Sequence, residues 1–321
     1  MLKSNKDKYR QLCQSTPGIP IFSRDWWLDA VCGSDSWDVA IVEKGSRVVG
    51  SMPYYVNRKY GFTVLMQPPL TQTLGPWLRP SKAKYAKALG EQKSIMQALI
   101  DLLPSFDYFG QNWHHSNTNW LPFYWRGFQQ TTRYTYILSD LTDENQLWGG
   151  LKENIRSDIR KAEGRCKLLV RDDLVLEDFL RLNRLTFQRQ GMTVPYSESL
   201  VRLLDVACVK RDCRKIWIAE DDKGRHHAGV FVVWDENSAY YIMGGGDPEL
   251  RNSGATSLCM WRAICHAATV TQMFDFEGSM IEPVEKFFRG FGARQIPYFS
   301  VKKANSKLLA LALAIRGMVK L

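Results

Sequence analysis

The chain has 321 residues, of which 45% are hydrophobic, and its 43 Lys and Arg outnumber 33 Asp and Glu, giving a net charge of +10. This length suits two domains of about 150 residues each, and the apolar content excludes a disordered chain. The basic excess favours phosphate-rich partners, namely nucleotide cofactors, nucleotide-sugars, tRNA or an anionic membrane, without choosing among them.

Strands dominate the elements that we expect in the first part of the chain. A strand hairpin is predicted at 37–43 and 47–57, with Lys44, Gly45 and Ser46 in the turn. The other expected elements are a helix at 25–32, a strand at 62–67, a proline-rich loop to residue 80, a helix at 81–103, and strands at 106–113 and 131–138.

In the second part, helices are expected to flank a mostly antiparallel sheet. One long polar helix is predicted over Glu144–Gly164, with Thr142 as its N-cap. The later elements are a strand at 166–171, helices at 176–190 and 197–211, strands at 215–220, 227–234 and 239–244, a helix at 253–269, a strand at 273–277, a helix at 282–290 and a strand at 296–301. The pattern predicts an α/β (α+β) fold with domains at 1–141 and 142–321.

Cysteine and histidine spacing gives no metal site. The seven cysteines include no C-x-x-C pair, and the five histidines have no metal-ligand spacing, so no metal is expected. An odd number of cysteines fits reduced thiols in a cytosol. The first twelve residues, MLKSNKDKYRQL, lack the apolar core of a signal peptide. We therefore expect a cytoplasmic protein.

The longest apolar run lies near the C-terminus, at Leu308–Ile315 (LLALALAI). It is too short to span a bilayer. We expect a buried helix here. The alternative is a segment that lies on the inner face of the membrane, so a peripheral membrane contact stays open. The oligomeric state stays open as well.

The strongest chemical signal is a glycine-rich strand end that leads into a helix, at 240–261 (YYIMGGGDPELRNSGATSLCMW). Glycines let backbone approach a ligand closely, and the first N–H groups of a helix form an anion site. Arg251 can add a charge-assisted contact to a phosphate. The alternative is an ordinary hairpin before a helix capped by Ser253 or Thr256.

The order of strand, Arg-x-x-Gly-x-small, helix and strand resembles the core of GNAT acyltransferases, although Thr256 stands where that family usually has Gly or Ala. The resemblance implies tandem GNAT-like domains, each a mostly antiparallel mixed sheet flanked by helices. It also implies that an acyl-CoA, most simply acetyl-CoA, is the co-substrate. The residues that would bind it are Met243, Gly244, Arg251, Asn252, Ser253, Gly254, Ala255 and Thr256.

Further stretches, at 118–136 with 153–163 and at 274–293, resemble the FemAB-related branch of tandem GNAT-like proteins. Its tRNA-dependent members have a Phe-Lys-x-x-Phe-Gly pattern, and Phe288 stands here in place of the Lys. This departure favours acyl-CoA over aminoacyl-tRNA as donor.

Three hypotheses stay open at this point. The first is an N-acetyltransferase-like enzyme acting on a small-molecule or lipid-linked sugar, or on another cell-envelope or polysaccharide precursor. The second is a FemAB-type transferase that uses aminoacyl-tRNA to build peptidoglycan bridges. The third is a non-catalytic protein that binds glycans or lipid precursors.

Two carboxylates are candidate general bases. Asp275 and Glu277 alternate with two phenylalanines in the expected strand, which places both on one face about 7 Å apart. Either could deprotonate an attacking amine. The alternative is a structural carboxylate that accepts hydrogen bonds from arginine or backbone donors.

Candidate acceptor-binding residues come from several segments. Arg156 and Arg160 share one helix face and could clamp a phosphate. The alternative is a solvated basic face with Glu153 and Asp158 as local partners. Trp113, His115 and Tyr241 complete the candidate set.

Overall fold

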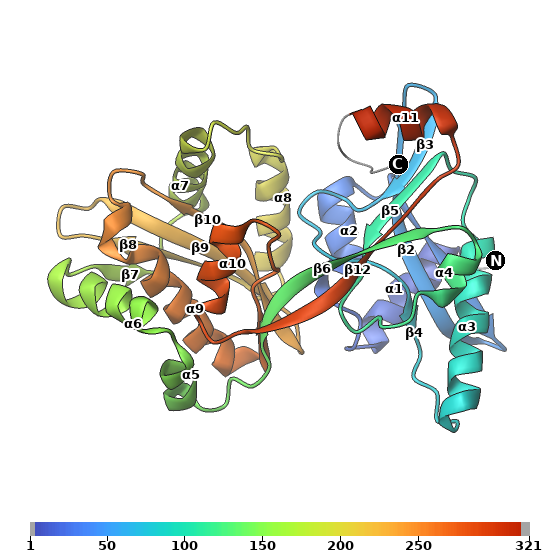
Figure 1. Cartoon of the computed structure of the whole chain (residues 1–321), viewed down its shortest axis with the longest axis horizontal. Helices are drawn as coiled ribbons and strands as arrows, with labels where there is room; N and C mark the ends of the chain where they lie inside the picture. Colours follow the sequence, from blue (N-terminus) through green and yellow to red (C-terminus); the bar gives the residue numbers. More distant parts are fainter. Residues whose placement is uncertain (1–3, 316–321) are drawn as a thin grey trace. The chain divides into compact units, whose positions relative to one another are not determined.

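The computed structural model describes residues 4–315, except for the side chains of 313–315 (Figure 1). The chain divides into unit 1, residues 1–133 with 297–321, and unit 2, residues Tyr134–Ile296. This division differs from the boundary expected at residue 141. Residues 297–321 belong to unit 1 because strand β12 (Arg294–Ala304) pairs with strand β5 (Tyr108–Asn112).

Unit 1 is a mixed sheet with helices on both faces. The strand order is β1-β2-β3-β5-β12, antiparallel except for the parallel β3–β5 pair, and β4 pairs with β2. The other elements are α1 (Asn5–Ser15), η1 (Ile21–Ser23), α2 (Asp25–Cys32), β1 (Trp37–Lys44), β2 (Arg47–Lys59), β3 (Phe62–Met66), β4 (Trp77–Leu78), α3 (Tyr85–Asp101), α4 (Leu121–Trp125) and α11 (Lys307–Ile315).

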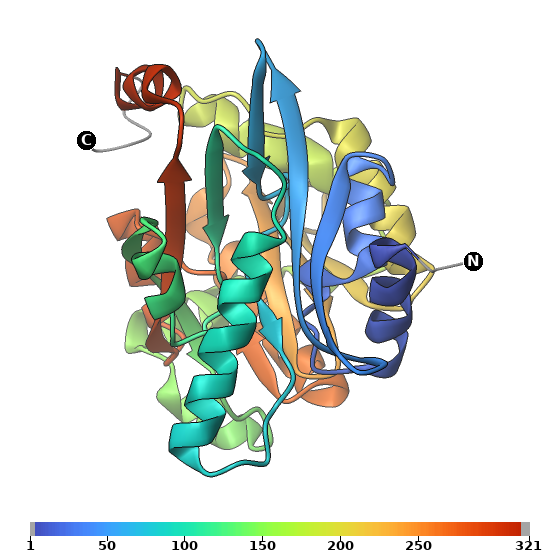
Figure 2. The same ribbon diagram turned by 90° about the vertical axis from the view of Figure 1, so that its right-hand side faces the viewer.

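Alternation along β1 explains the two faces of unit 1. Val39 and Ile41 pack with α1 and α2, whereas Ala40 and Val42 pack in the cluster that lies under α3. Figure 2 shows α3 on one side of these strands and the two N-terminal helices on the other. A period of two therefore sends successive side chains to opposite faces.

Unit 2 has the strand order β6-β11-β10-β9-β8-β7, in which only β10 and β11 are parallel. Its elements are β6 (Gln129–Leu138), which begins in unit 1, α5 (Glu144–Gly150), α6 (Glu153–Arg160), the π-helix η2 (Lys161–Arg165), β7 (Leu169–Arg171), α7 (Leu176–Arg189), α8 (Glu198–Val209), β8 (Arg214–Glu220), β9 (His226–Trp234), β10 (Ser238–Gly246), η3 (Arg251–Ser253), α9 (Ala255–Val270), β11 (Met273–Asp275) and α10 (Glu282–Arg289).

The two units repeat one topology. Unit 1 has three antiparallel strands (β1–β3), then helix α3, then β5 parallel to β3, with β12 antiparallel to β5. Unit 2 has β8–β10, then α9, then β11 parallel to β10, with β6 antiparallel to β11. The predicted tandem of mostly antiparallel mixed sheets flanked by helices is confirmed.

Three local predictions were wrong. The expected helix over 144–164 is broken, because Gly149 and Gly150 end α5 and the buried Leu151 is extended. Asp143 rather than Thr142 caps α5, since its carboxylate accepts hydrogen bonds from two backbone N–H groups. The C-terminal helix is not buried, because Leu308 is 69% and Leu311 is 51% exposed.

Among the described residues, no helix is both long enough and apolar enough to cross a bilayer.

Candidate donor-binding site

Strands β10 and β11 separate in the middle of the unit 2 sheet. Their parallel pairing covers only Ser238, Ala239 and Tyr240 of β10, whereas β10 continues beside β9 as far as Gly246. The register with β9 also shifts between Tyr241 and Met243, which marks a β-bulge at Ile242. Beyond Tyr240, the edge of β10 that faces away from β9 is therefore not occupied by β11.

Helix α7 covers part of this free edge. The Asn183 side chain donates a hydrogen bond to the carbonyl oxygen of Gly244 at 2.8 Å, and the Gly246 N–H donates to Thr186 Oγ1 at 2.9 Å. A Cβ on Gly245 would overlap the backbone of α7 at Asn183. At least one of the three glycines is thus required for helix packing, whereas the sequence suggested ligand contact as their purpose.

The loop after β10 is held against helix α6. Gly254 has a φ of +80° and is the residue before α9, and a Cβ there would overlap the carbonyl group of Asp158. The Lys161 ammonium also donates to the carbonyl oxygen of Asn252. These contacts fix the N-terminus of the 16-residue helix α9, whose first N–H groups have no partner within the helix.

A cavity of about 240 Å³ lies where β10, α7 and the start of α9 meet. Five of the sequence candidates line it: Gly244, Arg251, Ala255, Thr256 and Tyr241. The four other residues that were expected to bind acyl-CoA do not line it, namely Met243, Asn252, Ser253 and Gly254. Met243 is only 4% exposed and Ser253 only 7%, so these two side chains belong to the packed interior.

The cavity is suited to an anion. Arg189 at the end of α7 and Arg251 both line it, and both are exposed. Within the described part of the chain, the structure records no ion pair for either guanidinium. The positive end of the α9 dipole adds to these two charges. One acidic residue, Asp247, also lines the cavity.

Four lining residues lie outside the predicted segment 240–261: Thr186, Arg189, His227 and Ala228. The last two belong to β9, the hairpin partner of β10. The first two belong to α7, which is distant in the sequence, and no local motif marks them because tertiary packing brings α7 to β10.

Polar contacts fix the β8–β9 hairpin beside the cavity. His227 is buried, and its Nε2 lies 3.2 Å from Asp221 Oδ2. Burial opposes ionisation of Asp221, but hydrogen bonds from the Arg225 side chain and backbone outweigh it. The pKa of this carboxyl therefore lies well below its usual value.

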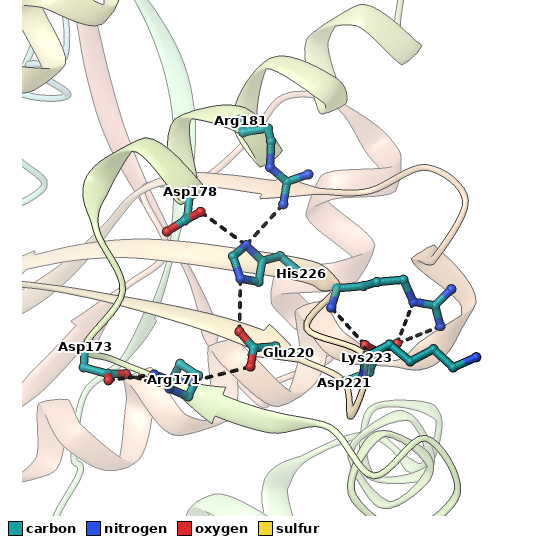
Figure 3. A network of polar contacts seen from close by, with 9 residues as sticks. Arg171, Asp173, Asp178, Arg181, Glu220, Asp221, Lys223 and His226 are labelled. Carbon is teal, nitrogen blue, oxygen red and sulfur yellow. Dashed lines mark hydrogen bonds and ion pairs between the residues drawn. The ribbon is translucent and has the colours of Figure 1, made fainter.

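The neighbouring His226 has a separate set of partners. Figure 3 shows its ring between Glu220 on one side and Asp178 and Arg181 on the other. Both histidines are therefore held by carboxylates of the hairpin or of α7. The contacts of His226 join the β8–β9 hairpin to α7.

The two candidate bases do not share a strand face. Strand β11 ends at Asp275, and Glu277 lies beyond it with a φ of +59°, a strained value for a residue with a side chain. Asp275 is buried and accepts hydrogen bonds from Thr135 Oγ1 and from the Glu277 N–H, the latter at 2.8 Å. The predicted alternation over 273–277 was wrong because this tight turn replaces the last residues of the strand.

Both carboxyls hold protons more tightly than usual. Burial raises the pKa of Asp275 to about 6, although its two hydrogen bonds oppose the shift. Burial and the Asp275 charge raise the pKa of Glu277 well above its usual value. Burial and then Asp235, Asp275 and Glu277 raise the pKa of Tyr240, so these carboxyls lie beside the part of β10 that precedes the bulge. Neither candidate base lines the cavity of about 240 Å³.

The predicted acceptor residues belong to both units and are described separately for each. Arg156 and Arg160 both contact Glu153, at 2.8 Å and 3.4 Å, as in the alternative of a basic face with local partners. Trp113 is fully buried in unit 1, where its ring packs against Phe123 at 4.7 Å. Trp113 is therefore a core residue and has no exposed surface that could contact a substrate.

His115 is half-buried in unit 1, with its ring 4.2 Å from that of His114. Burial lowers the pKa of both rings, to about 3 for His114, where the charge of His115 contributes as well. Both imidazoles are therefore neutral at pH 7.

Phe288 is part of the core of unit 2. It is 4% exposed, and its ring packs against Tyr241 at 5.7 Å and Phe276 at 5.3 Å. Lys286 and Arg289 pair instead with the glutamates one turn earlier in α10. Both cations therefore have carboxylate partners within α10 itself.

In the described part of the chain, no group of three or more His, Cys, Asp or Glu side chains is placed to hold a metal ion. All seven cysteines are free.

Comparisons with known proteins show what the chain is similar to. Residues 150–280 match the family model of the acetyltransferase (GNAT) domain. A search of curated proteins finds no match.

Solved structures resemble the chain over nearly its whole length. The crystal structure of FemX has a TM-score of 0.69 at 12% identity, covering 93% of this chain and 96% of FemX. The C-terminal domain of a putative lysylphosphatidylglycerol synthetase from Agrobacterium fabrum has a TM-score of 0.58 at 11% identity, covering 99% of both chains. A tandem GNAT protein from the clavulanic acid biosynthesis pathway, solved without acetyl-CoA, has a TM-score of 0.51 at 11% identity, covering 91% of this chain and 96% of that one.

At these identities the structural likeness establishes the fold. The chain has a GNAT-type fold in tandem form, and the residues that match the GNAT family model, 150–280, include all those that line the cavity of about 240 Å³.

Proposed function

We propose that this chain transfers an acyl group from acyl-CoA, most simply acetyl-CoA, to an amine. The observation that carries the proposal is the cavity lined by Arg189, Arg251 and the first turn of α9. Two arginines without ion pairs beside a helix N-terminus are suited to a diphosphate. The cavity is smaller than the 300–1,000 Å³ typical of a site for a drug-sized ligand, so it would hold the diphosphate region rather than the whole donor.

Unit 1 supplies a contrast at the equivalent point of its topology. There, β3 is followed by Pro68 and Pro69 and a long loop to α3 without a run of glycines, and Arg79 of this loop donates a hydrogen bond to the Val48 carbonyl and lies over the Trp77 ring. The contrast supports donor binding by unit 2.

In the proposed reaction, the amine nitrogen attacks the thioester carbonyl, and the C–S bond then breaks to release CoA. Backbone N–H groups at the Ile242 bulge would stabilise the oxyanion. Glu277 would accept the proton of the amine, because its raised pKa gives it the basicity for that step. Asp275 would act as a positioning residue, since it holds the Glu277 N–H.

For the acceptor, we propose the amine of an amino sugar or of another cell-envelope or polysaccharide precursor, free or lipid-linked. The cytoplasm, including the inner face of the membrane, is the proposed location, and the free cysteines support it. The buried Phe288 argues against the tRNA-dependent alternative, because no ammonium group occupies its place.

An acceptor screen tests the reaction. Acetyl-CoA is incubated with the protein and a panel of amino sugars, and the released thiol is measured. We expect thiol release that depends on both the protein and an amine. Retention of charged tRNA on a filter, falling steeply with salt, together with no thiol release would support the tRNA-dependent alternative instead. Sugar-nucleotide binding without transfer from either donor would support the non-catalytic one.

A further inference from the structure

A second and larger cavity, of about 630 Å³, lies within unit 1, away from the residues discussed above. It is enclosed by β2, β3, β5, β12 and helix α11, which lies beside β3 in Figure 1. Its apolar lining includes Phe62, Val64, Met66, Leu309 and Ala312. This volume is within the range of small-molecule sites.

The lining residues lie on the sheet face opposite to the cluster under α3, and none of them belongs to the cluster that packs with α1 and α2. Leu65, Phe109 and Val301 point into the core under α3. Their neighbours Val64, Tyr108 and Lys302 therefore point to the opposite face, because strand side chains alternate. Helix α11 covers only part of this face.

The cavity is lined by basic residues as well as apolar ones. Among the described residues that line the cavity, Lys59 and Lys302 are basic and none is acidic. Burial, and then the nearby Arg133, lower the pKa of Lys302. The Nε of Arg133 is itself buried without a hydrogen-bond partner. An anion beside Lys302 would offset the repulsion between these two cations.

The elements around the cavity expose further apolar and basic groups. Leu308 and Leu311 of α11 are more than half exposed, and Tyr60 at the tip of the β2–β3 hairpin is 86% exposed. The Lys59 ammonium lies 5.2 Å from the centre of the Tyr60 ring. Tyrosine and lysine beside exposed leucines are typical of a surface that contacts lipid.

We propose that this cavity binds an anionic amphiphile, with a single alkyl chain between the sheet and α11 and the anionic head at Lys302. A cavity without acidic residues selects an anionic head over a cationic one. The ligand would come either from free amphiphile or from an anionic membrane surface. This site is separate from the donor cavity, so it stands or falls independently of the proposed acyl transfer.

Displacement of a dansyl-labelled fatty acid from the intact chain tests the proposal. We expect laurate to displace the probe at about five- to tenfold lower concentration than dodecanol, because only laurate has a charged head for Lys302. Lys302→Gln should abolish that preference. Lys87→Gln removes the same charge from an exposed position of α3 and should leave the preference for laurate over dodecanol unchanged.

Substitutions that fill the cavity test where the alkyl chain of the ligand binds. Val64→Trp should abolish displacement, and Ala312→Trp fills the cavity from α11 if the first variant does not fold. Absence of laurate binding to the wild type, or unchanged binding to a folded filled variant, overturns the proposal. Cosedimentation with phosphatidylglycerol vesicles but not phosphatidylcholine vesicles, lost on filling, identifies a membrane source. Laurate binding without vesicle binding identifies free amphiphile.

Discussion

Replacing Glu277 by Gln is expected to lower kcat for acyl transfer by about 10²–10⁴-fold. Gln keeps the size of the side chain and the strained backbone but cannot accept the proton of the amine. Because donor binding involves other residues, KM for acetyl-CoA should change little. Steady-state kinetics with the best amine of the acceptor screen provides the measurement. Glu282→Gln is the control, since Glu282 is exposed and pairs only with Lys286.

The pH profile separates the roles of the two carboxyls. A base must be ionised, so wild-type kcat/KM should rise as pH increases through the raised pKa of Glu277. Asp275→Asn keeps an oxygen for Thr135 and for the Glu277 N–H but removes the charge that helps to raise the pKa of Glu277. The rise of kcat/KM with pH should therefore occur at lower pH in this variant. If Glu277→Gln still shows the same rise, at a rate near that of the wild type, Glu277 is not the base.

Replacing Gly254 by Ala is expected to destabilise the protein by about 3–4 kcal/mol. The residue has a φ of +80°, and the added Cβ would overlap the Asp158 carbonyl, which is backbone and cannot rotate away. The melting temperature should fall by roughly 6–16 °C. Differential scanning calorimetry measures the fall.

Gly90 provides the matched control for this substitution. It lies within helix α3 with ordinary helical backbone, and a Cβ there meets nothing within 4 Å. Gly90→Ala should raise stability by about 0.5–1 kcal/mol, because alanine loses less backbone entropy than glycine. If Gly254→Ala has the same melting temperature as the wild type, helix α6 does not support the loop in the way described.

Apolar segments and the turn residues between them were enough to predict most of the elements. The β1–β2 hairpin and strands β8–β10 are largely apolar, and turn residues separate them in the sequence. The order around the glycine-rich loop also indicated the fold class. The long helix over 144–164 failed because two glycines and the buried Leu151 outweigh helical spacing.

The site was less accessible to sequence reasoning. Arg251 was predicted because it lies next to a helix start, whereas Arg189 reaches the same cavity only because α7 packs on β10. Trp113 showed the opposite error, since an aromatic residue after a strand is as suited to a core as to a cleft. Motifs indicate local geometry, but tertiary packing decides which side chains share a cavity.

The central claim is that the unit 2 cavity binds the diphosphate of CoA through Arg251, and titration calorimetry with CoA and with pantetheine tests it most directly. The wild type should bind CoA, and Arg251→Glu should weaken binding by about 10–100-fold, because a charge-assisted hydrogen bond is lost. Arg262→Glu, further along α9 and paired with Glu163, is the charge-matched control and should leave binding unchanged. Pantetheine lacks the diphosphate, so its weaker binding should not respond to Arg251→Glu. A wild type with no affinity for CoA, or equal losses for CoA and pantetheine, would contradict the claim.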